Sequence, residues 1–361
     1  MLQTRVDSGL DGVIVADTVM SEVDGEAGRL IVRGHGLQEL VADRGFEGVA
    51  ALLWSGYGEG GSDENSVREG LAAARVRAFA DVPRLLAATE GLSPVEALRV
   101  GLGMLPDSDP TLHHYLVCGA MPVFLAALLN THKGLSAIAP DPTLTTAQDL
   151  LRMIRGQRAG EVFEKGLDTY LATVADHGFN ASTFTARVVA STRAGLISSV
   201  LAALCALKGP LHGGAPGPVL DMLDEIAEAS RARAWFDRAL DKGERLPGFG
   251  HRIYKVRDPR ADVLKATVAG MPMTAGRLAF AAEVEKEALA ALRRHKPGQR
   301  LDTNVEYYTA TLLEALEVPR EAFTALFAVG RVAGWCAHIF EQEKGGRIIR
   351  PQSSYVGPRP Q

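Results

Sequence analysis

Three of the nine histidines lie in sequence settings that suit catalysis. His177 follows Asp176, His212 is followed by two glycines, and His251 follows a Gly-Phe-Gly turn. Because glycine adds no side-chain bulk, a substrate or another backbone segment can come close to the imidazole. These three positions are candidates for acid–base or electrophilic chemistry. We interpret the other six as ordinary core or surface residues: His35, His113, His114, His132, His295 and His338.

His212 is expected to act as a neutral imidazole. Pro216 suits the first turn of a helix that continues through Leu220 and Ile226. The positive end of a helix dipole disfavours a charged imidazolium nearby. A neutral ring can still donate one hydrogen bond to a carbonyl oxygen and polarise it, so His212 is a candidate electrophile.

A metal site is a second interpretation of the three histidines, since three imidazoles could bind zinc. They lie far apart in the sequence and form no HxH, HxxxH or HExxH pair. The three cysteines, Cys118, Cys205 and Cys336, are separated and form no CxxC. We therefore expect reduced core cysteines and no metal, with a zinc hydrolase as an alternative.

A carboxylate candidate occurs at Glu306. The run Thr303-Asn304-Val305-Glu306, followed by apolar residues at helical spacing, matches a capping box. In that interpretation Glu306 only satisfies backbone donors at a helix start. The pattern alone leaves open a second interpretation, in which Glu306 is a catalytic base.

The elements that must position these residues are mostly helical. Short extended pieces are expected at 12–15 and 29–33, with an Asp24-Gly25 turn before the second. After about Phe46 the apolar spacing is helical, and the residues from Phe184 to Leu204 predict one long buried helix. Strands do not alternate with helices, Gly248-Phe249-Gly250 lacks the third glycine of a dinucleotide fingerprint, and no Walker A motif occurs, so a Rossmann or barrel fold is not indicated.

Length and composition exclude several classes of protein. The chain has 361 residues, 47% of them hydrophobic, and a net charge of −4. This length suggests two domains with sizeable cores and excludes intrinsic disorder and collagen. The apolar runs 115–129 and 194–207 are too short to span a bilayer, and no export signal precedes them, so a cytoplasmic protein without membrane contact is expected.

One segment departs from the overall charge. Residues 231–260 contain nine Lys or Arg against four Asp or Glu. A solvated helix face and an anion-binding surface both explain such a run. Because the whole chain is acidic and only 6% aromatic, a nucleic-acid partner is not expected.

Taken together, the ordered motifs resemble the signature segments of the citrate synthase family. The segments that carry the resemblance are 24–34, 176–184, 209–215, 247–260, 304–308 and 347–351. They extend over nearly the whole chain. The resemblance implies a mainly α, two-domain helical fold with a small N-terminal β element. Its large domain would comprise residues 1–213 and a return segment 314–361 with a C-terminal arm, and its small domain residues 214–313.

The resemblance also implies a reaction, the condensation of acetyl-CoA with oxaloacetate and hydrolysis of the citryl thioester to citrate and CoA, as in the tricarboxylic acid cycle. On matching positions, Glu306 would be the base, His212 would stabilise the enol and His251 would act at the oxaloacetate carbonyl. Arginine suits carboxylates because its planar fork binds them bidentately. The residues implied to hold oxaloacetate are His177, Arg260, Arg331 and Arg350.

The family's other features bear on CoA and on assembly. The basic run would face CoA phosphates through Lys255 and Arg257, on a loop that includes Gly248 and Gly250. A homodimer with shared active sites follows by resemblance, since the family's counterpart of Arg350 enters the neighbouring subunit's site. No cofactor is needed beyond acetyl-CoA as co-substrate.

Two departures keep alternatives open. Glu306 stands where the family usually has Asp, and its side chain is longer by about 1.5 Å. Gln352 stands where many relatives have Arg. The alternatives are a 2-methylcitrate synthase that uses propionyl-CoA, and a weakly active or non-catalytic relative that binds acyl-CoA or a dicarboxylate.

Overall fold

The computed structural model describes residues 9–10, 12–57, 63–107, 113–213, 216–272 and 275–360. Within these ranges the chain forms sixteen α-helices, one 3-10 turn and three short strands, which confirms the mainly α prediction. The elements in order are β1 (Ser21–Asp24), β2 (Arg29–Val32), β3 (His35–Gly36), α1 (Leu37–Asp43), α2 (Phe46–Trp54), α3 (Glu64–Phe79), α4 (Val82–Ala88), α5 (Pro94–Gly103), α6 (His113–His132), α7 (Thr146–Arg155), α8 (Glu161–Val174), α9 (Ala181–Ala190), α10 (Leu196–Leu207), α11 (Pro216–Ile226), α12 (Ala229–Asp241), α13 (Pro259–Ala269), α14 (Ala275–His295), α15 (Val305–Ala315), η1 (Arg320–Ala322) and α16 (Phe323–Gly345).

The strands form one small antiparallel sheet in the order β1-β2-β3. Asp24 pairs with Arg29 across the β1–β2 turn, as the Asp24-Gly25 signal predicted. The strand predicted at 12–15 is wrong, because no strand forms there and Ile14 is 87% exposed. These residues have no sheet face against which to bury their side chains.

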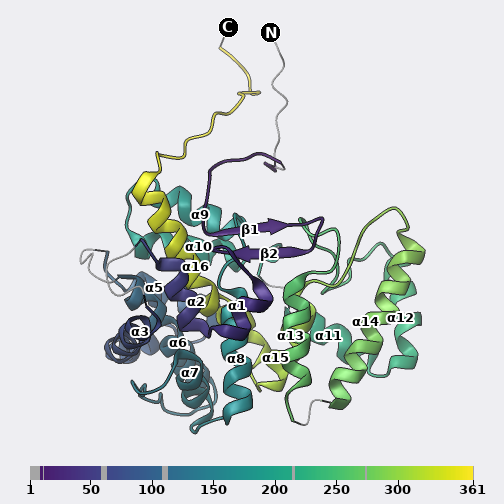
Figure 1. Cartoon of the computed structure of the whole chain (residues 1–361), viewed down its shortest axis with the longest axis horizontal. Helices are drawn as coiled ribbons and strands as arrows, with labels where there is room; N and C mark the ends of the chain where they lie inside the picture. The colour runs from purple at the N-terminus through teal and green to yellow at the C-terminus, as the bar shows by residue number, and fades with distance from the viewer. Residues whose placement is uncertain are drawn as a thin grey trace.

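Two long helices, α6 and α16, form the centre of the larger group of helices (Figure 1). α16 packs against α2, α6, α8, α9 and α10. At Gly334 an added Cβ would lie 2.2 Å from the carbonyl oxygen of Ala175, so only glycine permits this approach. The close packing places Arg331 of α16 beside the end of α8 and the segment that carries His177.

By length and composition, α6 and the stretch Arg320–Gly345 could cross a membrane, so the expectation that every apolar run is too short is wrong. In the folded chain, 94% of the apolar window of α6 and 83% of that of Arg320–Gly345 are buried. Such burial is typical of core helices.

The long helix predicted from Phe184 to Leu204 is also wrong, because the chain forms α9 and α10 instead. Arg193 and Gly195, which lie between them, have positive φ angles of 65° and 101°. These left-handed conformations end a right-handed helix. Asp107 then accepts hydrogen bonds from the backbone N–H groups of Ile197 (2.8 Å) and Ser198 (3.0 Å), which caps α10.

The cysteines are all free thiols. Cys118 of α6 and Cys336 of α16 are buried, as predicted. Cys205 of α10 is exposed, so the core prediction is wrong for that residue.

The helices α11 to α14 gather on one side of the molecule, drawn in teal and green in Figure 1. α12 packs along α14, while α11 and α13 both pack on α15. α13 also contacts α8 and α1, which belong to the larger group. The domain limits at residues 213 and 313 stay a prediction.

Candidate active site

The fold brings His177 and His251, 74 residues apart in sequence, into contact. Their ring centroids lie 5.4 Å apart in an edge-to-face arrangement. Nε2 of His177 also lies 3.2 Å from the hydroxyl of Tyr254. Burial, followed by the positive charges of Arg260 and other nearby groups, holds the pKa of His177 well below its usual value. His177 is therefore neutral at physiological pH.

The geometry of His251 fixes its tautomer. Its Nδ1 accepts hydrogen bonds from the backbone N–H groups of Ile253 and Tyr254, each at 3.1 Å. The ring proton must then lie on Nε2. Burial, reinforced by Arg260, lowers the pKa of His251 to about 4. His251 is thus a neutral hydrogen-bond donor through Nε2.

The turn before His251 requires both of its glycines. Gly248 and Gly250 have φ angles of 83° and 85°, which favour glycine. A Cβ at Gly248 would also lie 2.8 Å from Tyr307 Cδ2. The turn is held against the start of α15, since the side-chain amide of Asn304 donates to the carbonyl oxygen of Gly250 at 2.9 Å. The glycines thereby position His251 next to the Glu306 segment.

His212 is held by the first turn of α9. The backbone N–H of Ser182 points at Nε2 of His212 (3.3 Å), so Nε2 is the acceptor and Nδ1 carries the proton. The Ser182 hydroxyl lies 2.8 Å from the same nitrogen and accepts from the indole N–H of Trp335 at 3.2 Å. Burial, followed by the charge of Arg331, lowers the pKa of His212 to about 4. Burial is therefore the main cause of the neutral state, which sequence reasoning attributed to a helix dipole.

Two arginines bring positive charge to the same place. Arg260 is 3% exposed and Arg331 is 1% exposed. Arg260 forms a forked pair with Asp258, with nitrogen–oxygen distances of 3.0 and 2.7 Å. Arg331 donates from Nε to the carbonyl oxygen of Val174 and has no carboxylate within ion-pair distance among the described residues. Burial lowers the pKa of Arg331 to about 10; the nearby charge of Asp176 opposes this shift, and repulsion by Arg260 adds to it.

A buried guanidinium with no carboxylate in contact is costly, and an anion that binds beside it stabilises it. The charges of Arg260 and Arg331 both act on His177 and His212. The arginines and the neutral histidines thus belong to one site, in which Arg331 has no carboxylate in contact among the described residues. Such a site suits an acidic substrate.

The Glu306 segment does not form the predicted capping box. The N-cap of α15 is Asn304, whose side chain accepts from the backbone N–H of Glu306 at 3.0 Å. Thr303 instead donates its hydroxyl to Glu285 at 2.7 Å. The cap prediction therefore fails by one residue, and the Glu306 carboxyl is left for another role.

The environment of Glu306 suits a base. Burial raises its pKa to about 7, Asp258 adds to the shift, and Arg260 opposes it. A carboxyl group with a pKa near neutrality accepts protons better than an ordinary glutamate. Because Arg260 and Asp258 act on both Glu306 and His251, base and donor belong to one site.

Other sequence-predicted residues lie at the edge of this site or outside it. Lys255 is exposed, and its Nζ donates to the carbonyl oxygen of Arg252 at 3.2 Å. Arg257 is engaged within the chain, because its guanidinium pairs with Asp262 and Glu285, each at 2.5 Å. Arg350 is exposed in the C-terminal tail, which Figure 1 shows extending away from the helices. The CoA and carboxylate contacts expected of these residues stay predictions.

Sequence reasoning missed four residues that hold the site together: Ser182, Tyr254, Asp258 and Trp335. Asp258 had a readable signal, because Asp-Pro is typical of a helix start and Asp258 does cap α13. The others act through contacts between distant parts of the chain. Ser182 and Tyr254 lie within the segments 176–184 and 247–260, but the residue type of neither indicates which distant residue it contacts.

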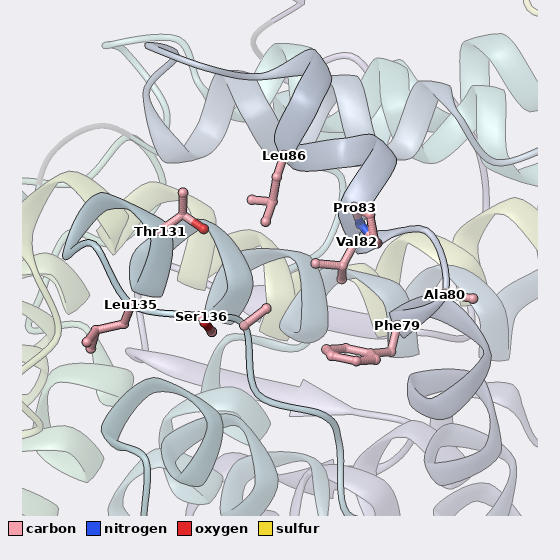
Figure 2. Close-up of a pocket in the computed structure, with 9 residues that line it drawn as sticks. Phe79, Ala80, Val82, Pro83, Leu86, Thr131, Leu135 and Ser136 are labelled. Carbon is pink, nitrogen blue, oxygen red and sulfur yellow. The ribbon is translucent and has the colours of Figure 1, made fainter.

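Two further observations concern ligands. No group of three His, Cys, Asp or Glu side chains suited to a metal ion occurs in the part of the chain that is described. An open hollow of about 550 Å³ lies near the ends of α3 and α6, and Figure 2 shows its mostly apolar lining. It shares no residue with the site and contains no titratable side chain.

Comparisons with known proteins identify the family of the chain. The family described as citrate synthase, C-terminal domain, matches residues 9–352. A citrate synthase of Haloferax volcanii is 35% identical over 368 residues, which cover 97% of this chain and 96% of the relative.

Solved structures are similar over the whole chain. A citrate synthase of Thermotoga maritima superposes with a TM-score of 0.87 at 33% identity, covering 98% of this chain and 96% of that one. A citrate synthase of Thermoplasma acidophilum, in a ternary complex with carboxymethyl coenzyme A and oxaloacetate, gives a TM-score of 0.86 at 25% identity, covering 99% and 97%.

Proposed function

Because the chain belongs to the citrate synthase family, whose members are transferases that form citrate, we propose that it condenses acetyl-CoA with oxaloacetate and hydrolyses the product to citrate and CoA. The observation that carries the proposal is the combination of neutral imidazole donors, buried arginines and a carboxyl group with a pKa of about 7 in one site. Such a site can bind a dicarboxylate, polarise two carbonyl groups and remove a proton.

Oxaloacetate binds first in this scheme, with its carboxylates beside Arg260 and Arg331. Its charge offsets the buried positive charge of Arg331, which has no carboxylate in contact among the described residues. The Nε2 proton of His251 donates to the ketone oxygen and makes the ketone carbon more electrophilic. His177, which is neutral and next to His251, adds a hydrogen bond without adding charge.

Glu306 then takes a proton from the methyl group of acetyl-CoA. The C–H electron pair becomes the carbon–carbon double bond of the enol, while negative charge moves to the thioester oxygen. The Nδ1 proton of His212 donates to that oxygen as its charge develops. Neutral imidazole suits this step, since an imidazolium would be expensive to bury.

Condensation follows when the enol carbon attacks the ketone carbon of oxaloacetate. The ketone π pair moves to oxygen, which takes the Nε2 proton of His251. The proton that Glu306 removed from the methyl group then returns to His251, so that both groups regain their starting states. Water then attacks the thioester carbonyl carbon of the citryl product, and the C–S bond breaks to release CoA. Of the protons that the attacking water loses, one converts the departing CoA thiolate to the thiol, and the new carboxyl group of citrate ionises. Acetyl-CoA is the co-substrate, and no further cofactor takes part.

The acyl group is the finer part of the proposal, and thiol release measures it directly. Purified protein is mixed with oxaloacetate and either acetyl-CoA or propionyl-CoA. We expect a higher kcat/KM with acetyl-CoA. One additional methylene changes binding by about 1–3 kcal/mol, so preference for propionyl-CoA by tenfold or more would identify a 2-methylcitrate synthase instead. Absence of thiol release with both would leave a binding protein.

We also propose a homodimer in which Arg350 of one chain completes the other chain's site. In support, Arg350 is exposed and its tail leaves the body of its own chain (Figure 1). Coexpression of Arg350→Ala with His212→Ala should then regenerate some complete sites in mixed dimers. Verified heterodimers that never exceed either parent homodimer would rule out sharing.

A further inference from the structure

A buried carboxylate outside the reacting groups lies at the junction of four elements. Glu285 of α14 is 5% exposed. Its Oε1 accepts from the Thr303 hydroxyl at 2.7 Å and from Nη1 of Arg257 at 2.5 Å. Its Oε2 accepts from the Tyr308 hydroxyl at 2.6 Å and from Nζ of Lys265 at 3.1 Å. Both oxygens are therefore fully used within the chain.

Two of these donors flank the base. Thr303 lies three residues before Glu306, and Tyr308 lies two residues after it. Glu285 thus holds the chain on both sides of Glu306, at the point where α15 begins. Two fixed points around a helix start restrict the direction in which the side chain between them can point.

A third donor belongs to the segment that carries His251. Arg257 lies between His251 and Arg260 in sequence. Its guanidinium also pairs with Asp262 and lies over the ring of Tyr308, 5.7 Å from the centroid. One carboxylate therefore binds both catalytic segments to the same helix.

Backbone pairing joins these segments to each other. Phe249 and Thr303 form an antiparallel bridge, and the N–H of Gly250 donates to the carbonyl oxygen of Asp302 at 2.7 Å. The N–H of Asp258 donates to the carbonyl oxygen of Thr303 at 3.1 Å. A displacement at Thr303 would therefore move both segments.

The charge balance shows that Glu285 is ionised. Burial alone would raise its pKa, but hydrogen bonds from Tyr308, Arg257 and Thr303 lower the pKa below its usual value. Two cations, Arg257 and Lys265, face the single carboxylate. An amide at this position would remove the charge and would turn an N–H₂ group toward donors on one side.

We propose that Glu285 is a positioning residue for the reaction, which aligns Glu306 with the His251 segment by holding Thr303, Tyr308 and Arg257. The proposal rests on the proposed function. Catalysis is sensitive to misplacement on the scale of 1 Å, so loosening this junction reduces turnover although Glu285 touches no reacting atom. Substrate affinity depends less on it, because Arg331 and His177 lie on other elements and Arg260, on α13, is held by its own forked pair with Asp258.

The test is Glu285→Gln in the full-length protein, measured by thiol release with acetyl-CoA and oxaloacetate across pH. We expect kcat to fall by about tenfold or more, with the KM for oxaloacetate within about threefold of the parent. The apparent pKa of the base should fall from near 7 toward an ordinary glutamate value, because a loosened Glu306 becomes better hydrated. A purely structural role would not move that pKa.

The matched control is Glu164→Gln. Glu164 is also a buried carboxylate, bonded to Arg158 at 2.6 and 2.5 Å on α8, away from both catalytic segments. The Glu164→Gln variant should have a lower thermal midpoint than the parent, with kcat and the pH profile unchanged. A folded Glu285→Gln protein with parental kcat and parental pH profile would overturn the proposal.

A second variant, Thr303→Val, tests the proposal if the Glu285→Gln protein does not fold. Thr303→Val keeps the side-chain shape and removes one hydrogen bond to Glu285. It should lower kcat and the apparent pKa in the same directions by a smaller factor, and parental values for both would contradict the proposal. An inactive parent protein would instead reject the proposed function.

Discussion

Two buried clusters of charge in this molecule differ in how completely they are paired. In the first, Arg75 of α3 is 0% exposed and donates to Asp149, the Thr146 hydroxyl and the carbonyl oxygen of Leu144, at 3.0, 3.2 and 2.6 Å. In the second, Arg331 is equally buried but has a backbone carbonyl as its hydrogen-bond partner and no carboxylate within ion-pair distance among the described residues.

This difference assigns a structural role to Arg75 and a ligand-binding role to Arg331. A buried charge whose donors are all satisfied fixes the packing of α3 on its neighbours. Arg331 feels the charge of Asp176 but has no carboxylate in contact, which leaves room for a ligand carboxylate to pair with it directly. The same residue type therefore has two roles, which the surrounding acceptors distinguish.

The largest expected effect comes from the two imidazole donors. His212→Ala and His251→Ala should each lower kcat by about 10²–10⁴-fold, because each removes a hydrogen bond to a carbonyl oxygen where charge develops. Steady-state thiol release measures the loss, and circular dichroism checks the fold. Near-parental turnover in both folded variants would refute this assignment of the site.

The second largest effect is expected at the base, Glu306. Glu306→Gln cannot accept a proton at neutral pH and should suppress condensation by about 10²-fold or more. Since Asn304 is the N-cap of α15, this change should leave the thermal midpoint nearly unaltered. Glu306→Asp should show intermediate activity, because it restores the family's usual carboxylate but shortens the reach. Early unfolding of the Gln variant with normal turnover would identify Glu306 as structural.

Substitution of the two arginines should have opposite effects on substrate binding and on stability. Arg331→Gln should raise the KM for oxaloacetate by about 10- to 100-fold and cost little stability, since it removes a buried charge that has no carboxylate in contact. Arg75→Gln should cost about 3 kcal/mol of unfolding free energy and leave that KM unchanged. Urea unfolding and oxaloacetate titrations measure both quantities, and the same pattern in the two variants would remove the distinction.

The smallest effect is the dependence on pH. With a pKa of about 7, Glu306 is mostly protonated at pH 6 and mostly ionised at pH 8. Because the ionised form is the base, kcat/KM should rise about tenfold over this interval. His212 and His251, with pKa values of about 4, stay neutral throughout. A profile that falls between pH 6 and 8 would contradict this account.

Much of the candidate site could be predicted from the sequence, because the groups that we propose to react lie within local motifs. Glycines lie beside His212 and His251, and Glu306 lies at a helix start. The local sequence was therefore enough to select these residues as candidates. The β1–β2 turn and the helical rhythm after Phe46 were readable for the same reason, since they depend on neighbours in sequence.

What the sequence did not predict depends on contacts between distant residues. Ser182 meets His212, 30 residues away, and Glu285 meets Arg257, 28 residues away. Breaks within apolar runs were also missed, since Arg193 has a left-handed φ that its residue type does not suggest. The cap of α15 was misassigned because Thr and Asn are both good N-cap residues. In the structure Thr303 donates its hydroxyl to Glu285, and Asn304 is the N-cap.

The most direct test of the central claim, that the candidate site removes a methyl proton through Glu306, is exchange of the acetyl-CoA methyl protons with deuterated solvent. The reaction is followed by NMR in the presence of a non-condensing dicarboxylate, with the parent protein and Glu306→Gln compared at pH 8. We predict deuterium incorporation by the parent and a rate at least about 10²-fold lower in the folded variant. Equal exchange by both proteins would show that the proton is taken by another group and would contradict the account.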